Sequence, residues 1–441
     1  MDRVLLTQRY QEHLAALERD YARVLGAAGY DAVVIHSGSA QLRCPFDDQY
    51  WPVRITPHFQ HWLPLPAADS ALVIRPGKRP KLVWTEENNF WEKPEPFRDD
   101  FWQGSFDIVR VDSRDKLANE LPTAGRVASV GEAAAPFGRD AKNQALTAEL
   151  DQLRTRKSSY EELCLVEANR RAAAGHAALA AAFRSGDASE FELHLLFLRA
   201  TEQDDGETPY KNIVALGENA ATLHHISYRK TAAQHADGQS LLVDAGASFL
   251  GYGSDITRTH VKGKSAAASA FAGLVRGVEQ LQARLCRDVR VGDPYEQLHD
   301  RAHDYVAATL RETGVVKISD AESVSRGITR AFFPHGLGHS LGLQTHDVGC
   351  ASVAPRADNP FLRNTSAIEA RQCFTIEPGV YFIDSLLAPL RQGPHASAID
   401  WRLVDQLKPL GGVRIEDDLV VVGNSEITRN LTRPYLPTSA Q

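Results

Sequence analysis

Acidic and imidazole side chains able to bind metal ions are concentrated in the second half of this 441-residue chain. Like charges a few ångströms apart repel strongly in a partly dry pocket, so four carboxylates gathered there need cations beside them. Oxygen ligands with a single nitrogen suit manganese, iron(II) or cobalt better than zinc. Two divalent ions would balance four carboxylates, which indicates two-metal hydrolytic chemistry. The five candidate ligands are Asp244, Asp255, His339, Glu377 and Glu416.

Strand ends and glycine-rich turns must position the first two of these ligands. Asp244 follows the apolar run Leu241–Val243, and by itself this pattern favours an aspartate that caps a turn over a metal ligand. Asp255 comes after a glycine-rich turn, so two strands of a hairpin would bring both carboxylates to one face. Thr257 and Thr259 would support the ligands on the second strand or be ordinary strand threonines.

The two glutamates stand at the ends of apolar segments. Glu377 precedes a Pro-Gly pair, which stops a strand and exposes the carboxylate at its end. Glu416 lies just before an apolar strand at 419–422. The alternative for each glutamate is a solvated charge at a strand end. We expect the neighbouring Asp417 and Asp418 to be such solvated charges.

Two phrases of the chain are specific enough to indicate a family. Phe333–His339 contains His335-Gly336-Leu337-Gly338-His339, in which the glycines permit close backbone packing near ions or simply form a turn. The second phrase is Gly411–Glu416. Together with the order of the five ligands, these phrases resemble the metallopeptidase superfamily with the pita-bread fold. Within it the resemblance is strongest to bacterial prolidases (Xaa-Pro dipeptidases), including the form described as organophosphorus acid anhydrolase, and spans nearly the whole chain.

The resemblance implies an architecture, a cofactor and a reaction. We expect an α/β N-terminal domain at 1–153 and an α+β pita-bread (creatinase/aminopeptidase-like) catalytic domain at 154–441. The five ligands would hold two divalent metal ions per subunit, with manganese the expected metal. The reaction would be cleavage of Xaa-Pro dipeptides that carry a free proline carboxylate, with side hydrolysis of organophosphate triesters, in a homodimer.

The resemblance also assigns catalytic roles. Glu377 would be a catalytic residue as well as a ligand, taking a proton from water and delivering it to the leaving nitrogen. His224, His335 and His346 correspond to histidines that face the substrate without binding metal, where imidazoles can stabilise an oxyanion. A tyrosine is common just after the first of these histidines, and the residue here is His225, whose role stays open.

Substrate-binding residues are implied in the same way. Arg363 and Arg414 correspond to arginines near the substrate, and a planar guanidinium can bind a carboxylate through two hydrogen bonds. We favour Arg363 for this contact, with a structural salt bridge as its alternative. Tyr210 corresponds to a pocket tyrosine of the organophosphate-hydrolysing relatives. Asp48 would lie at the tip of a loop that reaches into the partner subunit's site, although its aromatic surroundings are also typical of a core or an interface.

Other members of the superfamily are the main alternatives. Aminopeptidase P performs the same chemistry on longer Xaa-Pro peptides and stays open. Methionine aminopeptidase lacks a large N-terminal domain of this type. Metal-free creatinases and related binding proteins have lost ligands, whereas all five candidate ligands are present here.

Composition excludes several classes of partner. The chain carries 56 acidic and 49 basic residues, a formal net charge of −7, without a basic block for nucleic acid or a membrane surface. Five cysteines, odd in number and without CxxC spacing, argue against a disulfide framework. The charged N-terminus lacks the apolar run of a signal peptide, so we expect a soluble cytoplasmic protein.

Hydrophobic periodicity predicts the elements around these sites. In the N-terminal part we expect an amphipathic helix, a short buried strand, a hairpin and two further strands, at 1–28, 32–35, 71–74 with 81–84, 106–111 and 126–130. A polar stretch at 154–159 resembles a domain junction. Beyond it we expect a long helix at 160–183, strands at 239–243 and 253–261, and helices at 266–286 and 295–313.

Overall fold

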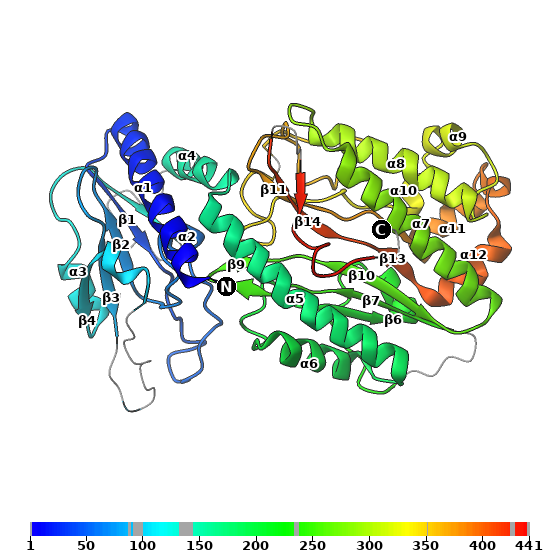
Figure 1. The fold of residues 1–441 in the computed structure, drawn as a ribbon, viewed down its shortest axis with the longest axis horizontal. Helices are drawn as coiled ribbons and strands as arrows, with labels where there is room; N and C mark the ends of the chain where they lie inside the picture. The colour runs from blue at the N-terminus through cyan, green and yellow to red at the C-terminus, as the bar shows by residue number, and fades with distance from the viewer. Residues whose placement is uncertain are drawn as a thin grey trace. The chain divides into compact units, whose positions relative to one another are not determined.

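The computed structural model describes residues 2–86, 90, 100–131, 144–232, 238–350, 352–423 and 428–438. The chain divides into two units, Met1–Leu163 and Cys164–Gln441, each shown in Figure 1. This division falls ten residues beyond the predicted boundary, which stays a prediction. None of the described helices has both the length and the apolar character needed to cross a membrane.

The first unit is built on one mixed sheet. Its elements are α1 (Arg3–Ala28), β1 (Ala32–His36), α2 (Pro57–Trp62), β2 (Ala71–Ile74), β3 (Lys81–Thr85), β4 (Asp107–Val111), α3 (Arg114–Asn119), β5 (Val127–Val130), α4 (Gln144–Thr155) and the start of α5 (Ser159–Ser185). The strand order is β4-β3-β2-β1-β5, with β3–β4 and β1–β5 parallel and the other pairs antiparallel. The predicted hairpin, helix and strands of this unit are confirmed.

Helix α1 shows why the prediction from periodicity succeeded. The Asp2 side chain caps its first turn by accepting from the backbone N–H groups of Val4 and Leu5, and Gly29 ends it in a left-handed conformation at φ 71°. Its buried face repeats at helical spacing, and side chains such as Tyr10, Leu14, Leu17 and Tyr21 lie in the core of the unit.

The second unit contains short sheets enclosed by helices. Its strands are β6 (Ile213–Leu216), β7 (Gln239–Asp244), β8 (Ser248–Phe249), β9 (Tyr252–Gly253), β10 (Thr257–Lys262), β11 (Cys373–Ile376), β12 (Gly379–Tyr381), β13 (Gly412–Arg414), β14 (Asp417–Val421) and β15 (Thr428–Asn430). They form the sheets β10-β7-β6, β11-β14-β15, β12-β13 and β8-β9. The single strand predicted at 253–261 is divided, because residues 254–256 leave the ladder before β10 begins.

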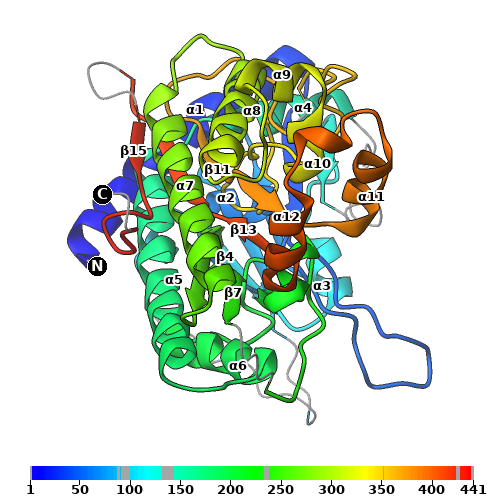
Figure 2. The same ribbon diagram turned by 90° about the vertical axis from the view of Figure 1, so that its right-hand side faces the viewer.

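Helices of the second unit cover the strands. They are α5, α6 (Glu190–Thr201), α7 (Ala266–Asp288), α8 (Tyr295–Glu312), α9 (Asp320–Ser325), α10 (Ile328–Phe332), α11 (Asp384–Gln392) and α12 (Trp401–Leu407). Helices α5 and α6 share one apolar core with β6 and β7, whereas α7, α8 and α10–α12 share another with β11–β14. Figure 2 shows α7 and α8 running side by side. Each of these two groups of strands is therefore covered by its own helices.

A buried histidine on α8 makes a prediction about acid stability. His303 is 3% exposed, packs against His299 and Phe333, and neither of its ring nitrogens has a hydrogen-bond partner among the described residues. Burial, assisted by the charge of His299, lowers the pKa of His303 to about 3. The unfolded chain, with a histidine pKa of ~6.5, binds more protons than the folded chain between these two pKa values, so stability is lost as pH falls below about 6.5.

We expect His303 to cost about 2 kcal/mol of stability between pH 7 and pH 5, since one pKa unit corresponds to ~1.4 kcal/mol. Replacing His303 by Phe removes the titrating group and keeps an aromatic ring against Phe333. Denaturant unfolding of both proteins at pH 7 and pH 5 measures the difference. An equal loss of stability in the two proteins would contradict the assignment.

Candidate metal centre

Asp244 and Asp255 meet at one end of the sheet β10-β7-β6. Asp244 is the last residue of β7 and pairs with Thr257, the first residue of β10, so Asp255 lies just beyond the same end. The Tyr210 hydroxyl oxygen is 2.8 Å from Oδ1 of Asp244 and 2.6 Å from Oδ1 of Asp255. A hydroxyl has one proton and can satisfy only one of these carboxylates at a time. The other carboxylate needs a further positive partner.

Strand register brings the two glutamates face to face. Ile376, at the end of β11, pairs with Asp417, at the start of β14, in an antiparallel ladder. Glu377 and Glu416 are the residues just beyond this pair, one on each strand, at the strand ends where both were predicted. Thr257 donates a hydrogen bond from its hydroxyl to Oε2 of Glu416 at 2.6 Å, so this threonine supports a candidate ligand.

His339 joins this cluster with one ring nitrogen available to an ion. Its Nδ1 lies 3.0 Å from the carbonyl oxygen of Ser340, which can only accept, so Nδ1 carries the proton. Nε2 lies 3.3 Å from Oδ2 of Asp255 and 3.8 Å from Oε1 of Glu377. One potential ligand atom each from Asp255, His339 and Glu416 falls within 4.8 Å of the others.

The glycine at 338 allows this approach. A Cβ there would lie 2.1 Å from the backbone oxygen of Thr375, a separation that no side chain can adopt. The predicted role of the glycines in close backbone packing is therefore confirmed at this position, next to His339.

The electrostatics of the cluster fit divalent cations. Burial and the charge of Asp244 raise the pKa of Asp255, and burial raises the pKa of Glu377 to about 7. Burial, followed by the charges of Asp255 and Glu377, also raises the pKa of Glu416 well above its ordinary value. The positively charged groups of the protein alone therefore do not balance the negative charge of these carboxylates. Carboxylate oxygens and one imidazole are a donor set that hard divalent ions accept, so the residues fit the metal group that the sequence implies.

A buried chain of polar groups connects Arg414 with His335. Arg414 forms an ion pair with Asp244, with Nη2 to Oδ2 at 2.6 Å, and donates to the Tyr381 hydroxyl at 2.9 Å. The Tyr381 oxygen is 2.8 Å from Nε2 of His335, whose Nδ1 donates to the carbonyl of Gly336 at 2.8 Å. Both ring nitrogens of His335 and much of the Arg414 guanidinium are therefore bound within the protein.

Three other predicted residues, His224, His346 and Arg363, have exposed side chains, and a ring contact places His346 against the cluster. The His346 ring contacts the His339 ring edge-on at 4.4 Å between centroids. Partial burial, followed by the charges of His339, Arg363 and His224, lowers the pKa of His346 to about 3. Arg363 is exposed and forms no ion pair within the part of the chain that the structure describes, unlike the structural salt bridge that was its alternative.

The structure shows what His225 contacts. Its Nε2 lies 2.9 Å from Oε2 of Glu190, a carboxylate that is 0% exposed. Glu190 also accepts from the backbone N–H groups of Leu216 and Arg229 and from the side chain of Asn219. One carboxylate thus ties together both ends of the segment that carries His224, and His225 is part of that attachment.

Further predictions concerned acidic residues outside this cluster. Asp417 and Asp418 are not solvated as predicted: both are 0% exposed, because α5, α7 and the segment after β15 cover β14. Asp48 is exposed in the first unit, between the bridged residues Leu42 and Tyr50.

Tyr381 is a residue of this region that the sequence analysis missed. The pairing of β12 with β13 brings Tyr381 to Arg414, and no local sequence pattern signals that pairing.

Family models match most of the chain. Residues 164–423 match metallopeptidase family M24, and residues 8–153 match the Xaa-Pro dipeptidase N-terminal domain. The chain is 40% identical to an Xaa-Pro dipeptidase of Pseudoalteromonas atlantica, covering 97% of this chain and 98% of that protein. It is 41% identical to an Xaa-Pro dipeptidase of Marinobacter nauticus, covering 96% of each.

Solved structures show the same fold at lower identity. Zinc-substituted aminopeptidase P of Escherichia coli in complex with product aligns with a TM-score of 0.70 at 20% identity, covering 98% of this chain and 96% of that chain. Proline aminopeptidase P II from Yersinia pestis aligns with a TM-score of 0.70 at 21% identity, covering 98% of this chain and 97% of that chain. The predicted fold class, an α/β domain followed by a pita-bread catalytic domain, is confirmed.

Proposed function

This chain belongs to metallopeptidase family M24, in its prolidase branch, and from that premise we propose that it hydrolyses Xaa-Pro dipeptides with a free proline carboxylate. The observation that carries the proposal is the convergence of Asp255, His339 and Glu416 within 4.8 Å, beside Glu377 and Asp244. These five residues would hold two divalent ions, and we propose manganese as the native metal because four oxygen ligands and one nitrogen suit it.

Bound divalent ions supply positive charge that lowers the pKa of water and stabilises an oxyanion. Glu377, whose Oε1 lies 3.8 Å from Nε2 of His339, would accept a proton from water and return it to the proline nitrogen. His346, whose ring contacts that of His339, and His224 are both exposed and would donate hydrogen bonds to the developing oxyanion. His335 would act from behind them, since both of its nitrogens are already bound.

The substrate class follows from the absence of an N–H group in the scissile bond and from Arg363. An Xaa-Pro bond is a tertiary amide whose nitrogen carries no hydrogen. An enzyme therefore cannot hold this bond through a backbone N–H hydrogen bond of the kind that pairs β-strands. Arg363 presents an exposed guanidinium without an ion-pair partner in the described residues. A free proline carboxylate would supply that partner through two charge-assisted hydrogen bonds. Arg414 and Tyr210 would instead act on substrate through the carboxylates they contact.

Metal analysis combined with rates on Ala-Pro and Ala-Pro-Ala tests the proposal. We expect bound divalent metal, loss of activity after chelation, recovery with Mn²⁺, and hydrolysis of Ala-Pro with little hydrolysis of the tripeptide. Equal rates on both peptides would favour an aminopeptidase P activity, whose members share this fold. A folded protein that binds no divalent metal would refute both alternatives.

We also propose a homodimer in which a loop of the first unit contributes Asp48. Residues 41–51 form an exposed hairpin-like loop, visible in Figure 2 as a blue extension, with backbone hydrogen bonds from Arg43 to Gln49 and from Trp51 to Gln41. The side chains of Leu42, Phe46, Tyr50 and Trp51 are all exposed, with Phe46 at 93%. Apolar side chains gathered on one loop are typical of a contact surface.

We expect Phe46→Ser together with Trp51→Ser to shift the protein from dimer to monomer in sedimentation velocity, because the apolar contact is lost. Asp48→Asn in the intact dimer should lower the rate on dipeptides. The exposed Val4→Ser serves as a control for loss of an apolar side chain elsewhere. A wild-type monomer at micromolar concentration would contradict the dimer.

Side hydrolysis of phosphotriesters belongs to the same proposal. Charged groups that stabilise a tetrahedral oxyanion at carbon can also stabilise a phosphoryl oxygen, and a leaving group such as fluoride or nitrophenolate needs no proton. We expect the manganese-loaded enzyme to hydrolyse a nitrophenyl phosphotriester faster than its Asp244→Asn variant, followed by nitrophenolate absorbance. Equal rates would remove the phosphotriester activity and leave the dipeptidase assignment in place.

A cytoplasmic location completes the proposal. All five cysteines lie within the described residues and none of them forms a disulfide, as is usual for proteins in a reducing compartment.

A further inference from the structure

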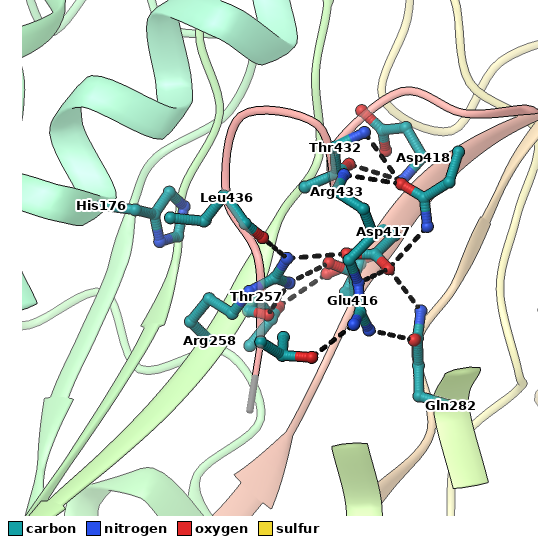
Figure 3. A network of polar contacts seen from close by, with 12 residues as sticks. His176, Thr257, Arg258, Gln282, Glu416, Asp417, Asp418, Thr432, Arg433 and Leu436 are labelled. Carbon is teal, nitrogen blue, oxygen red and sulfur yellow. Dashed lines mark hydrogen bonds and ion pairs between the residues drawn. The ribbon is translucent and has the colours of Figure 1, made fainter. Parts of the chain in front are cut away.

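Asp417 is a fully buried carboxylate with four hydrogen-bond donors. Arg258 Nη2 lies 2.8 Å from its Oδ1, and three groups approach its Oδ2: Gln282 at 3.0 Å, Asn430 at 2.8 Å and Arg433 Nε at 2.5 Å. Figure 3 shows Arg258, Gln282 and Arg433 converging on Asp417 from β10, α7 and the segment 428–438. The donors therefore connect the C-terminal segment with the strand that follows Glu416.

Arg258 extends this network to the backbone beside two candidate ligands. Its Nη1 donates to the carbonyl oxygens of Thr257 at 2.9 Å and Glu416 at 2.8 Å. Its Nη2 donates to the carbonyl of Leu436 at 2.8 Å, as well as to Asp417. One guanidinium thus fixes the start of β10, the backbone of Glu416 and the C-terminal segment relative to one another (Figure 3).

The next residue of β14 makes an equivalent connection on the opposite face. Side chains alternate along a strand, so Asp418 points away from Asp417. Its Oδ2 accepts from the backbone N–H of Asp255 at 3.1 Å and from Asn169 at 2.8 Å. Its own N–H donates to the Thr432 hydroxyl at 3.0 Å, and that hydroxyl donates to Asn169 at 2.7 Å. The same C-terminal segment therefore reaches a second candidate ligand.

We propose that the C-terminal segment 428–438 sets the metal affinity of the centre, with Asp417, Arg258 and Arg433 as positioning residues for Asp255 and Glu416. This inference rests on the proposed metal centre. Within the described part of the chain, these three side chains bond to groups other than the ligand carboxylates, so they act through backbone position. Groups that orient ligands change metal affinity because ligands held in place lose less entropy on binding.

Arg433→Gln tests the proposal most directly. Arg433 contacts Asp417, Gln282 and Thr438, so its loss leaves the candidate ligands and Arg258 chemically intact. Calorimetric titration of Mn²⁺ into the chelator-treated full-length protein should show affinity about 10–100-fold weaker than that of the wild type. Turnover at saturating Mn²⁺ should return to near the wild-type value. Arg433→Lys, which keeps the charge, should recover part of the affinity.

Arg391→Gln is the matched control, because Arg391 pairs with Asp405 at 2.7 Å on the surface and contacts no residue of this network. Its Mn²⁺ affinity should equal that of the wild type. A folded Arg433→Gln protein with wild-type Mn²⁺ affinity overturns the proposal. The proposal is also overturned if the variant melts at a lower temperature while its Mn²⁺ affinity stays unchanged.

If Arg433→Gln does not fold, Thr432→Val decides the question. It keeps the side-chain shape, removes the contacts with Asp418 and Asn169, and should weaken Mn²⁺ binding in the same direction. Wild-type affinity in this variant would overturn the proposal. A wild-type protein that binds no Mn²⁺ would instead refute the metal centre itself, so failure of the proposed function and failure of this inference are distinguishable.

Discussion

Replacing Asp255 by Asn should lower bound metal and reduce turnover by about a hundredfold or more. Asp255 is 5% exposed, lies 3.3 Å from Nε2 of His339 and shares the Tyr210 hydroxyl with Asp244. The amide keeps the shape of the side chain but removes one negative charge and one oxygen from the cluster. Glu416→Gln should act in the same way, since Glu416 belongs to the same group of potential ligands.

Metal content by elemental analysis and kcat on Ala-Pro measure these effects. The amide variants are expected to fold, and to be more stable than the metal-free wild type, because burial and neighbouring charges already raise the pKa of both carboxyl groups. Asp405→Asn, at the surface ion pair with Arg391, is the control and should retain metal and activity. A well-folded Asp255→Asn enzyme with near-normal turnover would contradict the two-metal assignment.

Replacing Arg363 by Ala should separate two kinds of substrate. The loss of a charge-assisted contact costs about 1.5–3 kcal/mol, which corresponds to roughly 10–150-fold in kcat/KM on Xaa-Pro dipeptides. Xaa-prolinamides lack the carboxylate, so their hydrolysis should change little. The comparison is informative because Arg363 has no ion-pair partner in the described residues whose loss would disturb the fold.

Steady-state kinetics of Ala-Pro and Ala-prolinamide on both enzymes provide the measurement. Arg356→Ala removes an exposed arginine that pairs with Asp300 at 2.6 Å and serves as the control for loss of charge. If the Arg363→Ala substitution lowers both activities equally, Arg363 does not bind the proline carboxylate, and the preference for dipeptides needs another explanation.

The positions of the candidate ligands are signalled locally in the amino-acid sequence. The Pro-Gly pair after Glu377 and the apolar run before Asp244 mark strand ends, and strand ends are where the structure places both residues. The two family phrases indicated His339 and Glu416. The helices and strands of the first unit were predicted from periodicity. This is possible because the buried face of a helix or strand requires apolar residues at regular intervals, which a short window of sequence shows.

The burial of Asp417 and Asp418 could not be inferred from local sequence patterns. Asp417 and Asp418 stand next to Glu416 in an acidic run that is typical of a solvated strand end, yet each is covered by partners distant in the chain. Asn169 is 249 positions from Asp418, and Gln282 is 135 positions from Asp417. No short window of sequence contains both members of such a pair.

What the sequence by itself determined is therefore the chemistry available: the types and order of the ligands, and the elements on which they stand. Only the tertiary structure decided which charges compensate one another. Arg414 meets Asp244, His225 meets Glu190, and Asp417 meets two arginines. The physical reason is that a charge is stabilised by whichever groups surround it in space, and strand pairing and helix packing, rather than neighbouring residues in the chain, bring those groups together.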